Sequence, residues 1–127
     1  MTIRIEQMDQ MQQDASERFI DKLMAHFVPL WPAQVKELGA GYRAWIEDGV
    51  RTAKGYGIDT QQLSARFINL WFVWGRDFEN RFGFEWAKEI VTAEKRNAAV
   101  KIHQLSYRTR VELEARENQQ NEMRMVA

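Results

Sequence analysis

The sequence predicts an all-α fold: a single compact bundle of about five helices, four of them substantial, with a frayed C-terminal tail. Apolar residues recur every three or four positions along most of the chain, and no long stretch alternates with period two. Proline and glycine separate these periodic stretches. The chain has 127 residues, 45% of them hydrophobic, which is enough for one domain with a buried core. We therefore expect a single helical domain over residues 1–127, with residues 1–7 and 115–127 flexible.

The first periodic stretch predicts a helix that ends near Val28. Its apolar residues share one helical face and are Met8, Met11, Ala15, Phe19, Leu23 and Phe27. Pro29 ends this helix, because the residue before a proline disfavours the helical conformation. Pro32 suits the first position of a second, short helix, where its missing N–H would have no partner in any case, and Gly39 follows that helix.

Two helices are predicted in the middle of the chain. In the first, residues 42–53, Gly49 lies on the apolar face, where its expected use is to let a neighbouring helix approach closely. Asp59 or Thr60 can cap the second through a side-chain oxygen. This second helix, which ends near Trp74, is apolar on all its faces and is therefore expected at the centre of the domain.

The rest of the chain predicts a structured loop over residues 75–83 and two further helices. The first, from about Phe84 to Thr92, is expected to bury Trp86 and Ile90, with Ala87 as a further candidate. The second starts between residues 94 and 97, and its apolar positions are Ala98, Ile102, Leu105, Thr109 and Leu113. Beyond these positions the chain has no apolar face to bury, so we expect the helix to fray.

Composition excludes several kinds of site. The 18 basic and 18 acidic residues balance, whereas nucleic-acid-binding domains normally carry a basic excess, so we expect no nucleic acid partner. The chain has no cysteine, which excludes disulfides and cysteine-ligated zinc, and its two histidines are too few for a histidine-rich metal centre. We expect no metal and no other cofactor.

The sequence shows no sign of export or membrane insertion. Its first residues contain no apolar segment typical of a secretory signal. The most apolar stretch, Phe67–Gly75, is much shorter than the roughly 20 residues that a membrane span needs. We therefore expect a cytoplasmic protein without a membrane partner.

The best candidates for catalysis are Asp77, Glu79 and His103. Two carboxylates and an imidazole can perform acid–base chemistry if the fold brings them within hydrogen-bond distance. We favour a structural interpretation, in which Asp77 braces the loop through backbone N–H groups and His103 lies on the flank of a helix. His26 is interpreted in the same way, because the dipole at a helix C-terminus stabilises a charged imidazole.

Aromatic and basic residues are also interpreted structurally, with one exception. Four tryptophans, Trp45, Trp71, Trp74 and Trp86, fall on apolar helix faces, where core packing explains them. Trp31, between two prolines, is least explained by a core, and we expect an exposed contact for a partner there. The arginines of the last helix alternate with glutamates, which predicts a solvated face.

The segment from Glu37 to about Leu105 carries a series of short motifs. They are Leu38-Gly39, Ile46-x-x-Gly49-Val50-x-x-Ala53, Tyr56-Gly57-Ile58, Leu70-Trp71-Phe72-Val73-Trp74-Gly75-Arg76-Asp77-Phe78 and Trp86-Ala87-x-x-Ile90. Through these motifs the chain resembles small bacterial helical proteins encoded beside type VI secretion spikes and polymorphic toxins. Trp74 stands where that group often has phenylalanine, and Val91 where it often has leucine. The motifs consist mostly of core residues, so the resemblance implies a shared fold and a partner encoded nearby, and it assigns no catalytic residue.

Three functional hypotheses follow. The first is a non-enzymatic protein-binding module of a bacterial secretion or toxin system, either an immunity protein or an effector adaptor or chaperone, that acts by steric docking. Its partner would be a toxin, an effector or a secretion component, and its candidate contact residues are Trp31, Arg76, Asp77, Glu79 and Asn80. The alternative is a small helical enzyme or ligand-binding domain, which requires Asp77, Glu79 and His103 to converge on one pocket. A weaker third hypothesis is a homo-oligomer joined through the first or last helix.

Overall fold

Helices form all the regular secondary structure of residues 5–126, the part of the chain that the computed structural model describes, with side chains described from Met11 to Arg124. The α-helices are α1 (Ile5–Phe27), α2 (Pro32–Leu38), α3 (Tyr42–Gly55), α4 (Gln61–Trp74), α5 (Glu85–Thr92) and α6 (Ala98–Val126). Short 3₁₀ turns lie at Gly39–Gly41 and Phe78–Asn80. The predicted all-α bundle is confirmed, with α1, α3, α4 and α6 as its substantial helices.

The helix boundaries follow the predicted signals. α1 stops before Pro29, and Pro32 is the first residue of α2. Thr60, rather than Asp59, caps α4, because its Oγ1 accepts a hydrogen bond from the Leu63 N–H at 3.3 Å. These signals act within a few residues, which is why the sequence alone places them well.

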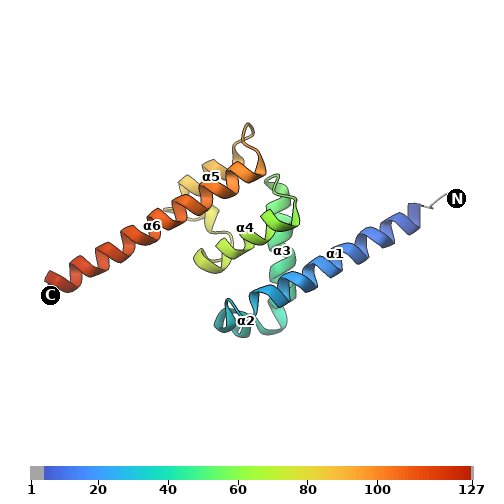
Figure 1. Ribbon diagram of the computed structural model, residues 1–127, viewed down its shortest axis with the longest axis horizontal. Coiled ribbons are helices and arrows are strands. Elements are labelled where there is room, and N and C mark those ends of the chain that lie inside the picture. Colours follow the sequence, from blue (N-terminus) through green and yellow to red (C-terminus); the bar gives the residue numbers. More distant parts are fainter. Residues whose placement is uncertain (1–4, 127) are drawn as a thin grey trace.

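α4 lies at the centre of the molecule, as expected, and packs against α1, α3 and α6 (Figure 1). It contributes buried side chains to two hydrophobic cores. In the first core, Phe67, Leu70 and Trp71 of α4 pack with buried residues that include Phe78, Ala87, Val91, Ile102 and Leu105. In the second core, Ile68 and Phe72 of α4 pack with Ile20, Leu23, Phe27, Tyr42 and Ile46. Every described helix except α2 supplies a fully buried residue to one of these cores.

Gly49 allows α3 and α4 to pack closely, as its position on the apolar face suggested. A Cβ atom built on Gly49 would lie 2.8 Å from Cγ1 of Ile68 and 3.5 Å from Cε3 of Trp71. Carbon atoms in favourable contact lie about 3.5–4.0 Å apart. The buried surface of α3 therefore has no room for a side chain at this position.

α5 is rotated relative to the prediction. The sequence predicted that Trp86 and Ile90 are buried, with Ala87 as a further candidate. Ala87 is indeed buried, at 0% exposed, but the second buried residue is Val91, at 1% exposed. Trp86 and Ile90 pack against the edge of the first core and remain half-buried. The eight residues of α5 make little more than two turns, too few for periodicity to distinguish neighbouring faces.

The first turns of α1 and the last turns of α6 extend away from the packed body (Figure 1). Met11 and Ala15 were expected on the packing face of α1 but are exposed, because no other helix reaches that part of α1. Leu113 on α6 is likewise 43% exposed. Residues 115–126, predicted as a frayed tail, continue α6 as helix with exposed side chains as far as Arg124. The side chain of Met8 lies outside the described residues, as do residues 1–4 and 127 of the ends that were expected to be flexible.

Candidate functional site

The connection between α4 and α5, residues 75–83, presents one aromatic side chain to solvent, and we call it the Phe82 loop. Phe82 is 98% exposed. The Phe84 N–H donates to the Arg81 carbonyl at 3.1 Å and closes a turn around Phe82 and Gly83. Gly83 has a φ of +93°, as the third position of a type II turn requires. Phe82 therefore stands at the tip of a defined turn.

Arg81 holds the beginning of the Phe82 loop in place. Its Nη1 donates to the Trp74 carbonyl at 3.2 Å and its Nη2 donates to the Arg76 carbonyl at 2.8 Å. The guanidinium lies against Gly75, where a Cβ atom would be only 2.9 Å from Nη1. Gly75 also has a φ of +106°, which side chains rarely allow. The backbone conformation thus favours glycine at residue 75, and a side chain there would also displace the guanidinium of Arg81.

Glu79 anchors the middle of the loop through its buried side chain. Its side chain is 1% exposed, and its Oε2 accepts a hydrogen bond from the Tyr56 hydroxyl at 3.0 Å. Its Oε1 has no hydrogen-bond partner among the described residues. Burial raises the pKa of Tyr56, and the nearby Glu79 carboxylate raises it further. Tyr56 therefore stays protonated and remains a donor to Glu79.

Polar contacts join the rest of the loop to α3 and α5. Asn80 Oδ1 accepts a hydrogen bond from Lys88 Nζ at 2.7 Å, and Arg76 Nη2 forms an ion pair with Asp48 at 2.6 Å. Asp77 adopts the left-handed conformation with a φ of +56°. Its side chain makes no capping hydrogen bond to the following turn and lies 3.5 Å from Arg76 Nε, so an ion pair replaces the bracing expected from backbone N–H groups.

Two of the residues predicted to contact a partner do not lie at the surface as expected. Glu79 is buried beneath the loop, so it positions the loop and cannot itself touch a partner. Trp31 is half-buried: its Nε1 donates to Asn69 Oδ1 at 2.9 Å, and its ring stacks on Phe72 with centroids 5.7 Å apart. Arg76 and Asn80 are exposed on the Phe82 loop.

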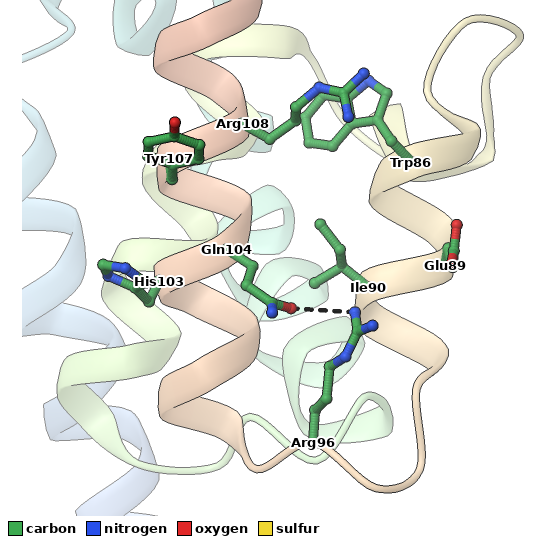
Figure 2. Close-up of a pocket in the computed structure, with 8 residues that line it drawn as sticks. All are labelled: Trp86, Glu89, Ile90, Arg96, His103, Gln104, Tyr107 and Arg108. Atoms are coloured by element: carbon green, nitrogen blue, oxygen red, sulfur yellow. Dashed lines mark hydrogen bonds between the residues drawn. The ribbon is translucent and has the colours of Figure 1, made fainter.

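Asp77, Glu79 and His103 do not meet in one pocket. Glu79 lines a cavity of 420 Å³ beside Phe82, whereas His103 lines a different cavity of 540 Å³ between α5 and α6. Asp77 lines neither of these cavities. Figure 2 shows the His103 ring on the side of α6 that faces away from α5. The convergence that the enzyme hypothesis requires is not seen for these three residues.

The cavity between α5 and α6 is an open groove with an apolar floor, and we call it the α5–α6 groove (Figure 2). Trp86 and Ile90 form its floor, and the guanidinium of Arg108 covers the Trp86 ring at 5.3 Å. At the other end Arg96 donates to Gln104 Oε1 at 3.1 Å. Arg116 covers Trp74 in a similar way at 4.8 Å. Part of the face of α6 that was predicted to be solvated therefore lies on tryptophans.

Sequence reasoning missed both Phe82 and the α5–α6 groove. The available signal for Phe82 was an aromatic residue followed by glycine in a polar loop, the pattern of a tight turn with an apolar tip. The groove had no such signal, because its two sides come from different helices. A comparison with protein-family models, with curated proteins and with solved structures found no match.

The described residues were also searched for two other kinds of site. None of their helices combines the length and the hydropathy that a membrane span needs. Among the same residues, no three histidine or carboxylate side chains gather closely enough to hold a metal ion.

Proposed function

We propose that this chain is a protein-binding module that docks to its partner through the Phe82 loop. The single observation that carries the proposal is a fully exposed phenylalanine on a loop that many contacts hold in one conformation. Aromatic side chains are enriched in protein–protein interfaces, where a few such residues supply most of the binding free energy.

Rigidity is what distinguishes Phe82 from an ordinary exposed side chain. Arg81 holds the start of the loop, Glu79 its middle, and a hydrogen bond from the Gly83 N–H to Glu85 Oε1 at 3.2 Å its end. A loop already held in its bound conformation loses little conformational entropy when a partner binds. Covering Phe82 contributes about 2 kcal/mol from the hydrophobic effect.

The cavity beside Phe82 supplies the polar part of the same docking surface. Its 420 Å³ are lined by residues of both charges, the basic Arg81 and Lys88 and the acidic Glu85 and Glu89. A surface with an apolar anchor and a mixed polar rim has the composition expected of a non-obligate interface. It favours a folded protein partner over a nucleic acid, which would need a basic excess.

The identity of the partner is proposed from the resemblance described above. Resemblance to proteins encoded beside secretion spikes and toxins favours a toxin, an effector or a secretion component encoded nearby. Binding would act by covering a functional surface of that partner. An immunity protein and an effector adaptor or chaperone are both compatible with this mode of action.

The test is binding between the full chain and the product of the adjacent gene, measured by co-purification and titration calorimetry. Phe82→Ala should weaken binding at least about tenfold, because it removes the anchor. It should leave the thermal stability unchanged, since the side chain makes no buried contact. Leu30→Ala is the matched control, because Leu30 is 54% exposed on the connection between α1 and α2.

Two results would contradict the proposal: no complex with any neighbour-encoded protein, or a complex that Phe82→Ala and Leu30→Ala affect equally. A growth assay with the co-expressed partner then separates the two roles. Protection from toxicity that Phe82→Ala abolishes identifies an immunity protein. Binding without any toxicity to suppress identifies an adaptor or chaperone.

A further inference from the structure

A cavity of 290 Å³ lies at the junction of α1, α4 and α6, and we call it the three-helix cavity. α4 lies between the other two helices and packs against both of them (Figure 1). None of the residues that line the cavity belongs to the Phe82 loop or to the α5–α6 groove. Its polar lining comes from all three helices and consists of His26 on α1, Arg66 and Asn69 on α4, and Ser106 on α6.

Three of these polar side chains can donate hydrogen bonds and have no acceptor within the described part of the chain. The side chains of His26, Arg66 and Ser106 make no hydrogen bond or ion pair to any residue that the structure describes. Each of them comes from a different helix, so the fold itself brings them to one cavity. Such a set of donors suits a group that accepts several hydrogen bonds at once.

Asn69 adds a fourth donor, because a neighbouring tryptophan fixes the orientation of its amide. Trp31 Nε1 donates to Asn69 Oδ1 at 2.9 Å. An indole N–H can only donate, so Oδ1 faces Trp31 and the amide Nδ2 is left to donate elsewhere. The described lining contains no aspartate or glutamate, whereas the α5–α6 groove has Glu89 and the cavity beside Phe82 has several carboxylates. The three-helix cavity therefore favours an anion.

Further positive charge lies one helical turn from the cavity. Lys22 precedes His26 by four residues on α1, and Arg110 follows Ser106 by four residues on α6, so each pair shares a helix face. The side chains of Lys22 and Arg110 are exposed, and neither forms an ion pair with another described residue. The whole chain has no net charge, so this positive excess is local to the surface around the cavity. It favours an anion with more than one negative charge.

The remaining lining is apolar and includes Ala65 and Leu70. From these observations we propose that the three-helix cavity binds a small organic phosphate. The phosphate group pairs with Arg66, whose planar guanidinium matches phosphate oxygens, and accepts hydrogen bonds from His26 and Ser106. A phosphate monoester carries a charge close to −2 near neutral pH, as the surrounding charge requires. The carbon part of the ligand lies against Ala65 and Leu70.

Titration of the full chain with phenyl phosphate at constant ionic strength tests this site. Binding should shift the Trp31 indole N–H signal in NMR spectra in a saturable way, because Trp31 is hydrogen-bonded to Asn69, which lines the cavity. Inorganic phosphate should bind more weakly than phenyl phosphate, since it lacks the carbon part. Phenol, which lacks the phosphate group, should leave the Trp31 signal unchanged.

Two substitutions make the test specific to the cavity. Arg66→Gln should weaken the binding of phenyl phosphate at least about tenfold, because it removes the charged hydrogen bonds to the phosphate group. Arg66 is exposed and makes no ion pair with the described residues, so this variant should fold, which circular dichroism verifies. Arg124→Gln is the matched control, because Arg124 is exposed on α6 and the net charge changes equally.

Three results would overturn the proposal. The first is a Trp31 signal that phenyl phosphate does not shift, and the second is equal weakening by Arg66→Gln and Arg124→Gln. The third is a ligand part that binds as tightly as the whole: phenol would indicate an apolar site, and inorganic phosphate a site for free phosphate. Each result is separate from the test of Phe82, because the two proposals use different surfaces and different ligands.

Discussion

Gly49 and Tyr56 show how single residues of this small protein depend on their surroundings. Gly49 leaves α4 the space that a side chain on α3 would occupy. Tyr56 supplies the hydrogen bond that a buried carboxylate, Glu79, receives. In both cases adding or removing a single heavy atom affects residues that are distant in the sequence. Point substitutions at Gly49 and Tyr56 should therefore change the stability of the protein.

Gly49→Ala should destabilise the protein by about 1–3 kcal/mol. The added methyl group meets Cγ1 of Ile68, which is fully buried and cannot move aside without shifting α4. Urea unfolding followed by circular dichroism measures the change. Gly55→Ala in the same helix is the control, since a Cβ there has nothing within 4 Å and should be neutral or slightly stabilising. Equal effects of the two substitutions would show that close packing is not the function of Gly49.

Tyr56→Phe should cost about 1.5–3 kcal/mol at neutral pH, because it leaves the buried Glu79 carboxylate without its hydrogen bond. The effect should depend on pH. Folding raises the pKa of Tyr56 above its ordinary value of 10.0, first through burial and then through Glu79. The resulting contribution to stability is complete below about pH 10 and is lost as the pH rises further, because the unfolded chain then loses the proton more easily.

Unfolding of the wild type and of Tyr56→Phe between pH 7 and about pH 11 checks this prediction. The difference in stability between them should be constant up to about pH 10 and then shrink. The exposed Tyr107 provides the control variant Tyr107→Phe, which should leave stability at pH 7 unchanged. A Tyr56→Phe protein as stable as the wild type would show that Glu79 does not depend on this hydrogen bond.

At the scale of an element, the Phe82 loop is defined by its side-chain contacts. Its only helical element is one short 3₁₀ turn, and contacts to α3, α4 and α5 hold it in place. A loop of this kind combines an exposed tip with a fixed backbone. Its rigidity therefore depends on side chains that themselves need not touch a partner.

Arg81→Lys should loosen the loop without unfolding the protein. Lysine keeps the positive charge but lacks the planar fork that reaches the carbonyls of Trp74 and Arg76 together. Hydrogen exchange should become faster in residues 75–83 and stay unchanged in α4. Partner binding should weaken, because the loop must be ordered on association. Arg110→Lys on α6 is the control, and equal exchange in the two variants would contradict the assigned role of Arg81.

At the scale of the whole molecule, α4 joins two hydrophobic cores into one folding unit. Phe67 belongs to the first core and Ile68 to the second, and both are 0% exposed. Two neighbouring residues of one helix thus pack into different hydrophobic cores. Because α4 belongs to both cores, unfolding of α4 disrupts both of them. The two cores should therefore unfold together.

Phe67→Ala and Ile68→Ala should each lower the stability by about 2–5 kcal/mol. Each should shift a single transition that appears at the same denaturant concentration by far-UV circular dichroism and by tryptophan fluorescence. Ala65→Gly on the same helix, where the side chain is half-buried, should cost only about 1 kcal/mol. Separate transitions for the two probes would show that the cores unfold independently.

Much of the fold could be predicted from the sequence, and the candidate site much less so. The end of α1, the bounds of α2 and α4, the close approach at Gly49 and the central place of α4 all agree with the prediction, whereas α1 begins at Ile5, within residues that were expected to be flexible. The exposure of Phe82 was missed although its turn carries a sequence signal, and the burial of Glu79 and the hydrogen bond of Trp31 could not be predicted. Each depends on residues from other helices, as Trp31 does on Asn69, which lies 38 positions away.

The sequence by itself determined where the helices form and which of them is central, because helical periodicity, capping and proline act over a few neighbouring residues. Only the tertiary structure decided the rotation of α5, the covering of Trp74 and Trp86 by arginines, and the choice between a buried and an exposed side chain in the Phe82 loop. The physical reason is that the exposure of a side chain depends on which distant parts of the chain pack against it. The pattern of neighbouring residues in the sequence does not contain that information.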